Sequence, residues 1–143
     1  MLASNRTSDQ RAILVKYAAN ILSRRPYFRH QLRQKLFLYS EKKNFEPSTS
    51  LIETIITDLA KSGYLDDQYL ADAYVRRQLQ KCYGPKIIRY KLKLLGLSED
   101  IIRQSLAQEA NKEALEIATE RLKTKFRAQD PRKLRQKLYQ RGF

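Results

Sequence analysis

The sequence predicts an all-α protein built from tandem three-helix repeats, the third of them incomplete. Apolar residues recur at helical spacing along most of the 143-residue chain, and no run rich in Val, Ile and Thr alternates as a strand would. Glycine and proline are rare, with 4 of each, and most of them stand next to the ends of the periodic stretches. One basic-apolar pattern occurs three times along the chain.

Four helices are expected in the first part of the chain. Each has an apolar stripe that recurs at i, i+3 or i+4, as on the buried face of an amphipathic helix. Hydroxyl residues at 48–50 are suited to cap the third helix, and Gly63 stands where a left-handed residue would end it. Asp66 and Asp67 are the expected caps of the fourth helix. The four helices are expected over about 9–24, 27–42, 48–63 and 66–82.

Four further helices are expected in the rest of the chain. Pro85 and Pro131 stand where a helix begins, because the first turn has no partner for the N–H group that proline lacks. Gly96 and Gly142 follow apolar stripes and are the expected C-terminal residues in the left-handed conformation. The stripes that mark these helices lie at 88–95, 98–106, 115–126 and 134–138.

The repeated pattern is an apolar residue, Arg, any residue, Lys and Leu, and it begins at Leu32, Ile88 and Leu134. Each copy follows another helix, and the first two copies also precede one. A unit of three helices buries little surface alone, so adjacent units are expected to stack into an elongated, curved array. The expected repeats are 1–65, 66–109 and 110–143, and the last lacks its third helix.

The charge of the chain favours a polyanionic partner. It carries 29 Lys and Arg against 15 Asp and Glu, a formal net charge of +14. The excess is spread along the sequence, with +5 over 1–66, +3 over 67–109 and +6 over 110–143. Because it recurs at matching helix positions, a long and repetitive partner fits this charge better than a compact one.

The repeated basic residues are the candidates for contact with that partner. Lys86, Arg89 and Lys93 have the i, i+3, i+7 spacing that places side chains in one row of a helix. Such rows contact phosphates without reading sequence, although many Lys and Arg runs are simply solvated helix faces. The full candidate set is Arg24, Arg25, Arg29, Arg33, Lys35, Arg76, Arg77, Lys81, Lys86, Arg89, Lys93, Arg132, Arg135 and Lys137.

The scarcity of reactive residues argues against an enzyme. With only His30 and Cys82, an internal disulfide is excluded and a zinc site of the usual Cys/His kind lacks ligands. No glycine-rich phosphate loop occurs, so neither a nucleotide nor any other cofactor is expected. No secretory signal and no membrane-spanning stretch is recognisable, which favours the cytoplasm.

The centre of the chain carries a specific motif. It reads GYLDDQYLA over 63–71, GPKIIRYKL over 84–92 and LGL over 95–97. In order and spacing these segments closely resemble the core of the bacterial RecX regulatory proteins, which read G-Y/F-L/I-D-D-x-x-F/Y-A, then G-x-x-x-I-x-x-x-L, then a glycine followed by Ile or Val. The resemblance implies tandem three-helix repeats and binding to the RecA recombinase filament on single-stranded DNA.

The resemblance also implies inhibition without catalysis. Proteins of this family restrain the ATPase and strand-exchange activities of RecA and so modulate DNA repair, recombination and the SOS response. We expect a monomer that also contacts the DNA backbone. Two alternatives stay open: a DNA-binding protein of helix-turn-helix type that acts without recombinase, and a helical scaffold with a solvated basic surface. Family members usually complete the third repeat, whereas this chain ends at Phe143, after the second helix of that repeat.

Overall fold

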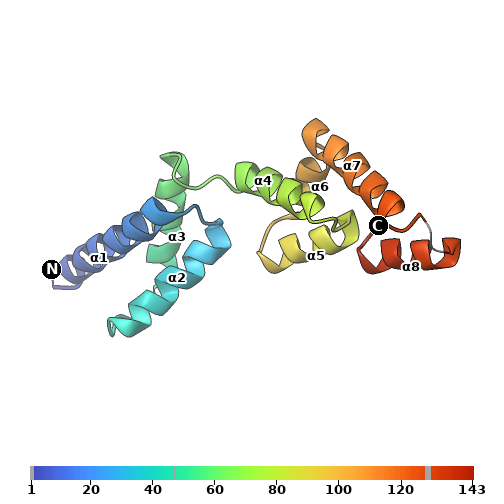
Figure 1. Cartoon of the computed structure of the whole chain (residues 1–143). Helices are drawn as coiled ribbons and strands as arrows, with labels where there is room; N and C mark the ends of the chain where they lie inside the picture. The colour runs from blue at the N-terminus through green and yellow to red at the C-terminus, as the bar shows by residue number, and fades with distance from the viewer. Residues whose placement is uncertain (1, 47, 128–129) are drawn as a thin grey trace. The chain divides into compact units, whose positions relative to one another are not determined.

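The computed structural model describes residues 2–46, 48–127 and 130–143, and within them all regular structure is helical (Figure 1). This confirms the all-α prediction. The first helix begins seven residues earlier than its apolar stripe predicted, and the other helices follow the predicted order. Their bounds are α1 Leu2–Arg24, α2 Arg29–Lys42, α3 Thr49–Lys61, α4 Asp67–Gln80, α5 Pro85–Leu94, α6 Glu99–Ala107, α7 Glu109–Lys125 and α8 Pro131–Gln140.

Contacts divide the chain into two compact units, Met1–Asp66 and Asp67–Phe143. The first unit contains α1, α2 and α3, and the second contains α4 to α8. The boundary lies one residue beyond the end predicted for the first repeat. The second and third predicted repeats fall together in the second unit, and their separation at residue 109 stays a prediction.

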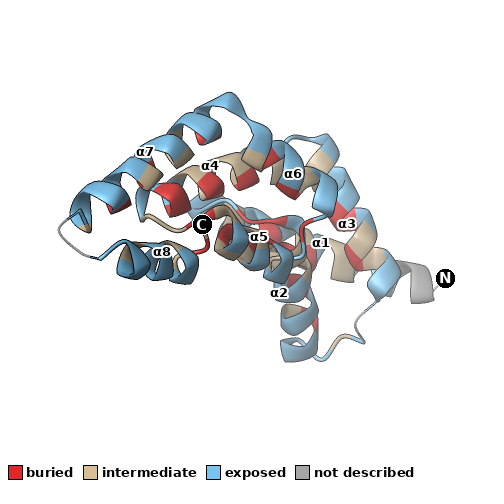
Figure 2. Cartoon of the chain, turned by 90° about the vertical axis from the view of Figure 1, so that its right-hand side faces the viewer, coloured by how far each residue is buried: buried red, intermediate tan, exposed pale blue. Residues whose placement is uncertain are grey.

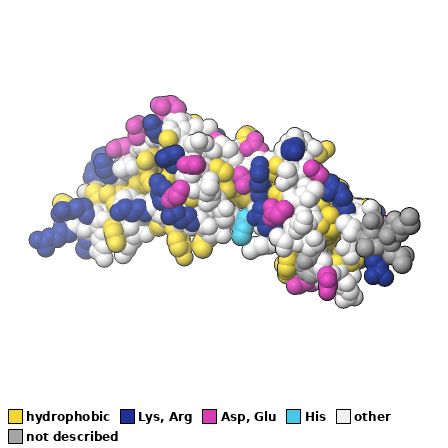
Figure 3. Space-filling view, turned by 180° about the vertical axis from the view of Figure 1, so that it is seen from behind, with side chains coloured by type: hydrophobic (Ala, Val, Ile, Leu, Met, Phe, Trp, Pro, Cys, Tyr) yellow, Lys and Arg dark blue, Asp and Glu magenta, His cyan; other side chains and the backbone are white. Residues whose placement is uncertain are grey.

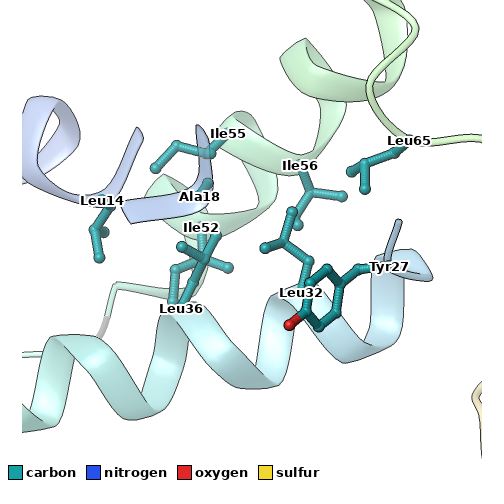
Figure 4. Close-up of a cluster of buried hydrophobic side chains, with 9 residues drawn as sticks. All are labelled: Leu14, Ala18, Tyr27, Leu32, Leu36, Ile52, Ile55, Ile56 and Leu65. Carbon is teal, nitrogen blue, oxygen red and sulfur yellow. The ribbon is translucent and has the colours of Figure 1, made fainter. Parts of the chain in front are cut away.

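The core of the first unit is built by all three of its helices (Figure 4). Each helix contributes side chains spaced three or four residues apart, which is why its stripe faces inward. Burial of one Leu or Ile side chain contributes about 1.5–3 kcal/mol, so this cluster is the main source of stability in the unit. Its members are Leu14, Ala18, Tyr27, Leu32, Leu36, Ile52, Ile55, Ile56 and Leu65.

The second unit buries its apolar stripes among α4, α5 and α6, with α7 packed over α4 and α6. The least exposed of its apolar side chains are those of Ala71, Val75, Ile88, Leu92 and Ile102. In contrast, α8 has no buried residue, and its two leucines are only half-buried (Figure 2). Most of the α8 surface is therefore open to a partner.

The three helices that carry the repeated pattern are followed by the same backbone conformation. Asn44, Gly96 and Gly142 follow α2, α5 and α8 with φ of 59°, 80° and 89°. In each case the next residue donates its N–H to the carbonyl five residues earlier, at 2.8, 3.2 and 2.9 Å. This is the Schellman motif that satisfies the last carbonyls of a helix. The repeat is therefore present in the geometry as well as in the sequence.

Capping residues explain where several helices begin. The Ser48 hydroxyl accepts a hydrogen bond from the Leu51 N–H at 3.2 Å, and Ser98 accepts one from Ile101 at 3.4 Å. The carboxylate of Asp130 accepts the N–H of Arg132 at 3.0 Å. All three side chains replace missing intrahelical partners, and Ser48 is among the caps that the sequence predicted.

Cys82 was expected at the end of the fourth helix, but it lies outside that helix in the structure. The helix α4 ends at Gln80, and Cys82 follows in a turn with φ of 61°. The N–H of Tyr83 donates to the carbonyl of Gln78 at 3.1 Å, so this turn is also a Schellman motif. A cysteine in the left-handed region is unusual, which is why the helix was predicted to end two residues too late.

The end of α8 is attached to the start of α5 by backbone hydrogen bonds. The N–H of Gly84 donates to the carbonyl of Arg141 at 2.5 Å, and that of Lys86 donates to Gly142 at 3.0 Å. At the start of a helix these N–H groups have no intrahelical partner, so the incoming carbonyls satisfy them. This pair of hydrogen bonds, the α5–α8 clasp, positions the exposed α8.

Candidate nucleic-acid interface

Arg33, the arginine of the first pattern copy, forms an ion pair with Glu53 of α3. Its Nε and Nη2 atoms both donate to the carboxylate, and the Nη2–Oε2 distance is 3.3 Å. Both side chains are partly exposed, so the pair adds little stability but does hold the guanidinium in place. Arg33 therefore contributes less free positive charge than its sequence position indicated.

The other candidates of the first unit are exposed around the end of α1 and along α2. The Arg25 guanidinium lies 4.3 Å from the centre of the Tyr27 ring, a cation–π contact that leaves its charge accessible. No ion pair of Arg24 or Lys35 occurs among the described residues. The exposed candidates here are Arg24, Arg25, Arg29 and Lys35.

In the second unit, Arg76 belongs to helix packing rather than to a surface row. It is half-buried on α4, and its Nη2 donates to the side-chain oxygen of Gln108 at 3.2 Å. Gln108 is the residue that precedes α7, so this contact joins α4 to the start of α7. Arg77 and Lys81 are exposed near the end of α4, as a binding role requires.

The row on α5 is partly neutralised by one carboxylate. Glu99, the first residue of α6, accepts from Lys93 Nζ at 3.1 Å and from an Arg89 guanidinium nitrogen at 3.2 Å. The hydrogen bond from Lys93 and the charges of both cations hold the pKa of Glu99 below its usual value. Lys86, the third member of the row, lies 5.6 Å from the centre of the Tyr139 ring.

We expect the lowered pKa of Glu99 to be visible in acid. A depressed folded-state pKa contributes stability above the unfolded-state pKa, and this contribution is lost as pH falls through the folded-state value. Replacement Glu99→Gln removes the ionisable group. The free energies of unfolding of the wild type and Glu99→Gln, measured in urea against pH, should therefore converge as pH decreases.

The control for this prediction is Glu120→Gln. Glu120 lies on an exposed helix face and has only a distant ion pair with Lys123, at 3.7 Å. Its replacement should leave the acid dependence of unfolding nearly as in the wild type. Unfolding free energies that stay parallel for wild type and Glu99→Gln down to the acid limit would contradict the assignment.

The candidate residues on α8 are the most accessible of the set. It has no acidic residue between Pro131 and Gln140, and Arg132, Arg135 and Lys137 are all exposed. Among the described residues none of these three side chains forms an ion pair. Figure 3 shows the Lys and Arg side chains that gather over this part of the second unit, at the left of the view.

The three repeated arginines are therefore not equivalent. Arg33 and Arg89 each face a glutamate from the third helix of their repeat, whereas Arg135 lies on the last helix of the chain. Sequence reasoning grouped them because it detects spacing within a helix and not the acid supplied by another helix. It also omitted Lys133, which is exposed on α8 beside the other cations. Its position within the same basic segment would have identified it.

Exposed tyrosines accompany the basic residues. Tyr90 and Tyr139 are 63% and 73% exposed, on the two helices that the α5–α8 clasp joins. In contrast, Tyr27 is buried, and Tyr17 and Tyr39 stack on each other with ring centres 3.9 Å apart. The first two rings are thus available for stacking on bases, and the others serve the core.

Other kinds of site find no support in the described ranges. Within residues 2–46, 48–127 and 130–143, no group of three or more His, Cys, Asp or Glu side chains could hold a metal ion. In that same part of the chain, no helix combines the length and the apolar character needed to cross a membrane.

Comparison with known proteins gives the chain a family. Residues 66–106 match the family model described as the second three-helix domain of RecX. The regulatory protein RecX of Haemophilus influenzae is 32% identical over 133 residues, which cover 90% of this chain and 83% of that protein. The chain belongs to the RecX family. RecX of Thermotoga maritima is 35% identical over 130 residues, covering 90% and 76%. RecX proteins are regulators and not enzymes, as the sequence predicted.

Solved RecX structures agree with the fold. A crystal structure of a regulatory protein RecX matches with a TM-score of 0.72 and 27% identity, covering 99% of this chain and 71% of that one. RecX from Lactobacillus salivarius matches in fold with a TM-score of 0.73. A Geobacillus RecX is 35% identical, but the matched part covers only 42% of its length. The chain therefore spans less than half the length of this relative but most of the length of the Haemophilus influenzae protein.

Proposed function

We propose that this protein regulates the RecA recombinase by binding its filament on single-stranded DNA. Bound there, it inhibits the ATPase and strand-exchange activities and so modulates DNA repair and recombination. The observation that carries the proposal is membership of the RecX family over most of the chain. The protein acts as a monomer in the cytoplasm, and it contributes binding energy and no chemical step.

The distribution of accessible cations supports a filament as the partner. A filament displays DNA phosphates at regular intervals, and cations placed at intervals on a protein bind such phosphates without reading sequence. The exposed candidates without an ion pair in the described part of the chain are Arg24, Lys35, Arg77, Lys81, Arg132, Arg135 and Lys137. Arg25 and Lys86 add exposed cations that lie over the rings of Tyr27 and Tyr139.

The test is hydrolysis of ATP by preformed RecA filaments on poly(dT). We expect the protein to slow hydrolysis in proportion to its occupancy of the filament, because it restrains the subunits that hydrolyse. The rate with saturating protein is compared with the rate with buffer alone. Unchanged hydrolysis at saturating protein, shown by co-sedimentation to be bound, would contradict inhibition.

A second measurement distinguishes the helix-turn-helix alternative. Binding to bare duplexes of different sequence is measured at several salt concentrations, since the electrostatic part of the affinity falls as salt rises. A filament regulator should discriminate little among the duplexes. Strong discrimination among duplexes, with no effect on recombinase, would instead establish a sequence-specific DNA-binding protein.

A further inference from the structure

Two exposed tyrosines of the second unit lie next to the same lysine. Tyr139 on α8 is 73% exposed and Tyr90 on α5 is 63% exposed. The Nζ atom of Lys86 lies over the Tyr139 ring, 5.6 Å from its centre. Lys86 and Tyr90 are four residues apart on α5, so their side chains are neighbours on the surface of that helix. These three residues form the Tyr139–Lys86–Tyr90 strip.

The α5–α8 clasp holds the strip together before any ligand arrives. The backbone N–H of Lys86 donates to the carbonyl of Gly142 at 3.0 Å, and the N–H of Gly142 donates to the carbonyl of Tyr139 at 3.0 Å. Lys86 and Tyr139 are thus connected through a single residue, although they belong to different helices. A surface that is ordered in advance loses less entropy when it binds.

The strip differs from the other contact between a ring and cations in this unit. Lys91 and Arg141 lie over the Tyr83 ring, at 4.0 and 5.5 Å from its centre, and that ring is half-buried. The Tyr83 contact therefore belongs to the packing of the fold. Lys86 and Tyr139 are both exposed, so the charge and the ring remain accessible to a ligand.

The charge around the strip favours a phosphate. Neither α5 nor α8 contains an Asp or Glu residue. Glu99, which contacts α5 from the next helix, pairs with Arg89 and Lys93. A phosphate over Lys86 would therefore meet no carboxylate of either helix, and a cation is what it requires.

The two rings fit the remaining part of a nucleotide. Exposed aromatic side chains beside a basic groove are the surfaces on which successive unpaired bases stack, in a way that tolerates any sequence. In a duplex the faces of the bases are covered by their neighbours, so only a single strand can use such rings. Figure 3 shows side chains of the hydrophobic class, which includes Tyr, projecting between Lys and Arg on the second unit, at the left of the view.

We propose that the Tyr139–Lys86–Tyr90 strip binds single-stranded DNA through its bases. One base stacks on Tyr139 and another on Tyr90, while Lys86 neutralises a phosphate between them. This rests on the proposed function, under which the single strand is the one that the recombinase holds. The strip adds selectivity for single strands to the phosphate contacts of α8, which a duplex could make equally well.

Tryptophan fluorescence reports the stacking directly. The chain contains no Trp, so Tyr90→Trp and Tyr139→Trp each introduce a single reporter that can still stack. We expect poly(dT) to quench both, whereas inorganic polyphosphate, which has phosphates and no bases, should quench neither. The matched control is Tyr64→Trp, since Tyr64 is 66% exposed in the first unit and should not be quenched. Unquenched fluorescence at either strip position with saturating poly(dT), or equal quenching by polyphosphate, would overturn the proposal.

Removal of the rings separates stacking from charge. Tyr90→Ala and Tyr139→Ala should each weaken binding of naked poly(dT) at least about fivefold, whereas the Phe replacements should resemble the wild type. The salt dependence of the Ala variants should be unchanged, because they lose no phosphate contact, while Lys86→Gln should reduce its slope by about 0.7. Circular dichroism and the melting temperature establish that the variants fold. Equal poly(dT) affinity of the Ala variants and the wild type would overturn the proposal.

Two further readouts complete the experiment. Affinity for a poly(dA)·poly(dT) duplex should be the same for the wild type and the Ala variants, and a matching loss on the duplex would overturn base stacking. Hydrolysis of ATP by RecA filaments is measured with the same proteins. Inhibition by the wild type without quenching of either reporter would overturn the strip alone. Quenching without inhibition by the wild type would support the strip and overturn the proposed function.

Discussion

Replacement Gly84→Ala is expected to detach α8 from the second unit. Gly84 precedes α5, and a Cβ atom there would lie 2.4 Å from the carbonyl carbon of Gly142 and 2.6 Å from the N atom of Phe143. Both are backbone atoms, which cannot move aside as the end of a flexible side chain can. Overpacking of this kind costs about 1–3 kcal/mol, and it breaks the two hydrogen bonds of the α5–α8 clasp.

The effect of Gly84→Ala should be confined to α8, because that helix has no buried residue and little else attaches it. Hydrogen exchange should show faster exchange over 131–143, while the amides of α4 to α7 retain most of their protection. Far-UV circular dichroism should lose helical signal corresponding to no more than the ten residues of α8.

The control for this prediction is Gly63→Ala. Gly63 has φ of 83° and no atom within 4 Å of a Cβ position, so its replacement strains the backbone without a collision. A left-handed conformation costs an alanine roughly 1–2 kcal/mol, which should lower the stability of the first unit only. Unchanged exchange over α8 in Gly84→Ala would show that the clasp does not hold this helix.

Gly84 also shows how far sequence reasoning extends. Gly84 and Pro85 identified a helix start and a family motif, which are local features. The same position in the first repeat is Phe28, which also precedes the second helix, so the turn itself does not require glycine. The reason for Gly84 is the approach of Gly142, 58 residues later, and no local pattern contains that information.

The helices were predictable because their signals are local. Caps such as Ser48 and Ser98 and the glycine at 96 act within one turn, so the sequence contains the whole interaction. Asn44 ends α2 in the same way as Gly96 ends α5, but asparagine adopts positive φ less often and was overlooked. Local rules thus predicted the positions of the helices better than the residue at which each helix ends.

The candidate site was only partly predictable, for a physical reason. Spacing places Arg89 and Lys93 in one row, but the charge of that row depends on Glu99 of the next helix. In the same way Arg76 was grouped with surface cations, although it contacts Gln108 beside α7. Which cations remain unpaired is decided by tertiary packing, and this makes α8 the part of the set to test first.

The triple charge reversal Arg132→Glu, Arg135→Glu and Lys137→Glu should strongly weaken filament binding. It changes the formal net charge from +14 to +8 on a helix that has no acidic residue of its own. Each phosphate that the protein no longer neutralises reduces the steepness of log affinity against log salt by about 0.7–0.9, so three phosphates reduce it by about 2–3. At low salt the affinity for poly(dT) filaments should fall by at least about tenfold, since each neutralised phosphate contributes to counterion release. Co-sedimentation over a salt series measures both quantities.

A control variant with the same net charge shows whether the position of the replaced cations matters, or only the change in net charge. Lys16, Lys42 and Lys61 are exposed in the first unit and lie outside the candidate set, so their triple replacement by Glu also gives +8. If the cations of α8 contact phosphates, the control variant should lose only long-range attraction, which salt screens. The slope of its log affinity against log salt concentration should then stay close to that of the wild type. Equal reductions of slope in the two triple variants would mean that the filament senses total charge. In that case α8 would have no special part in binding, and the restraint on recombinase would have to come from protein–protein interactions alone.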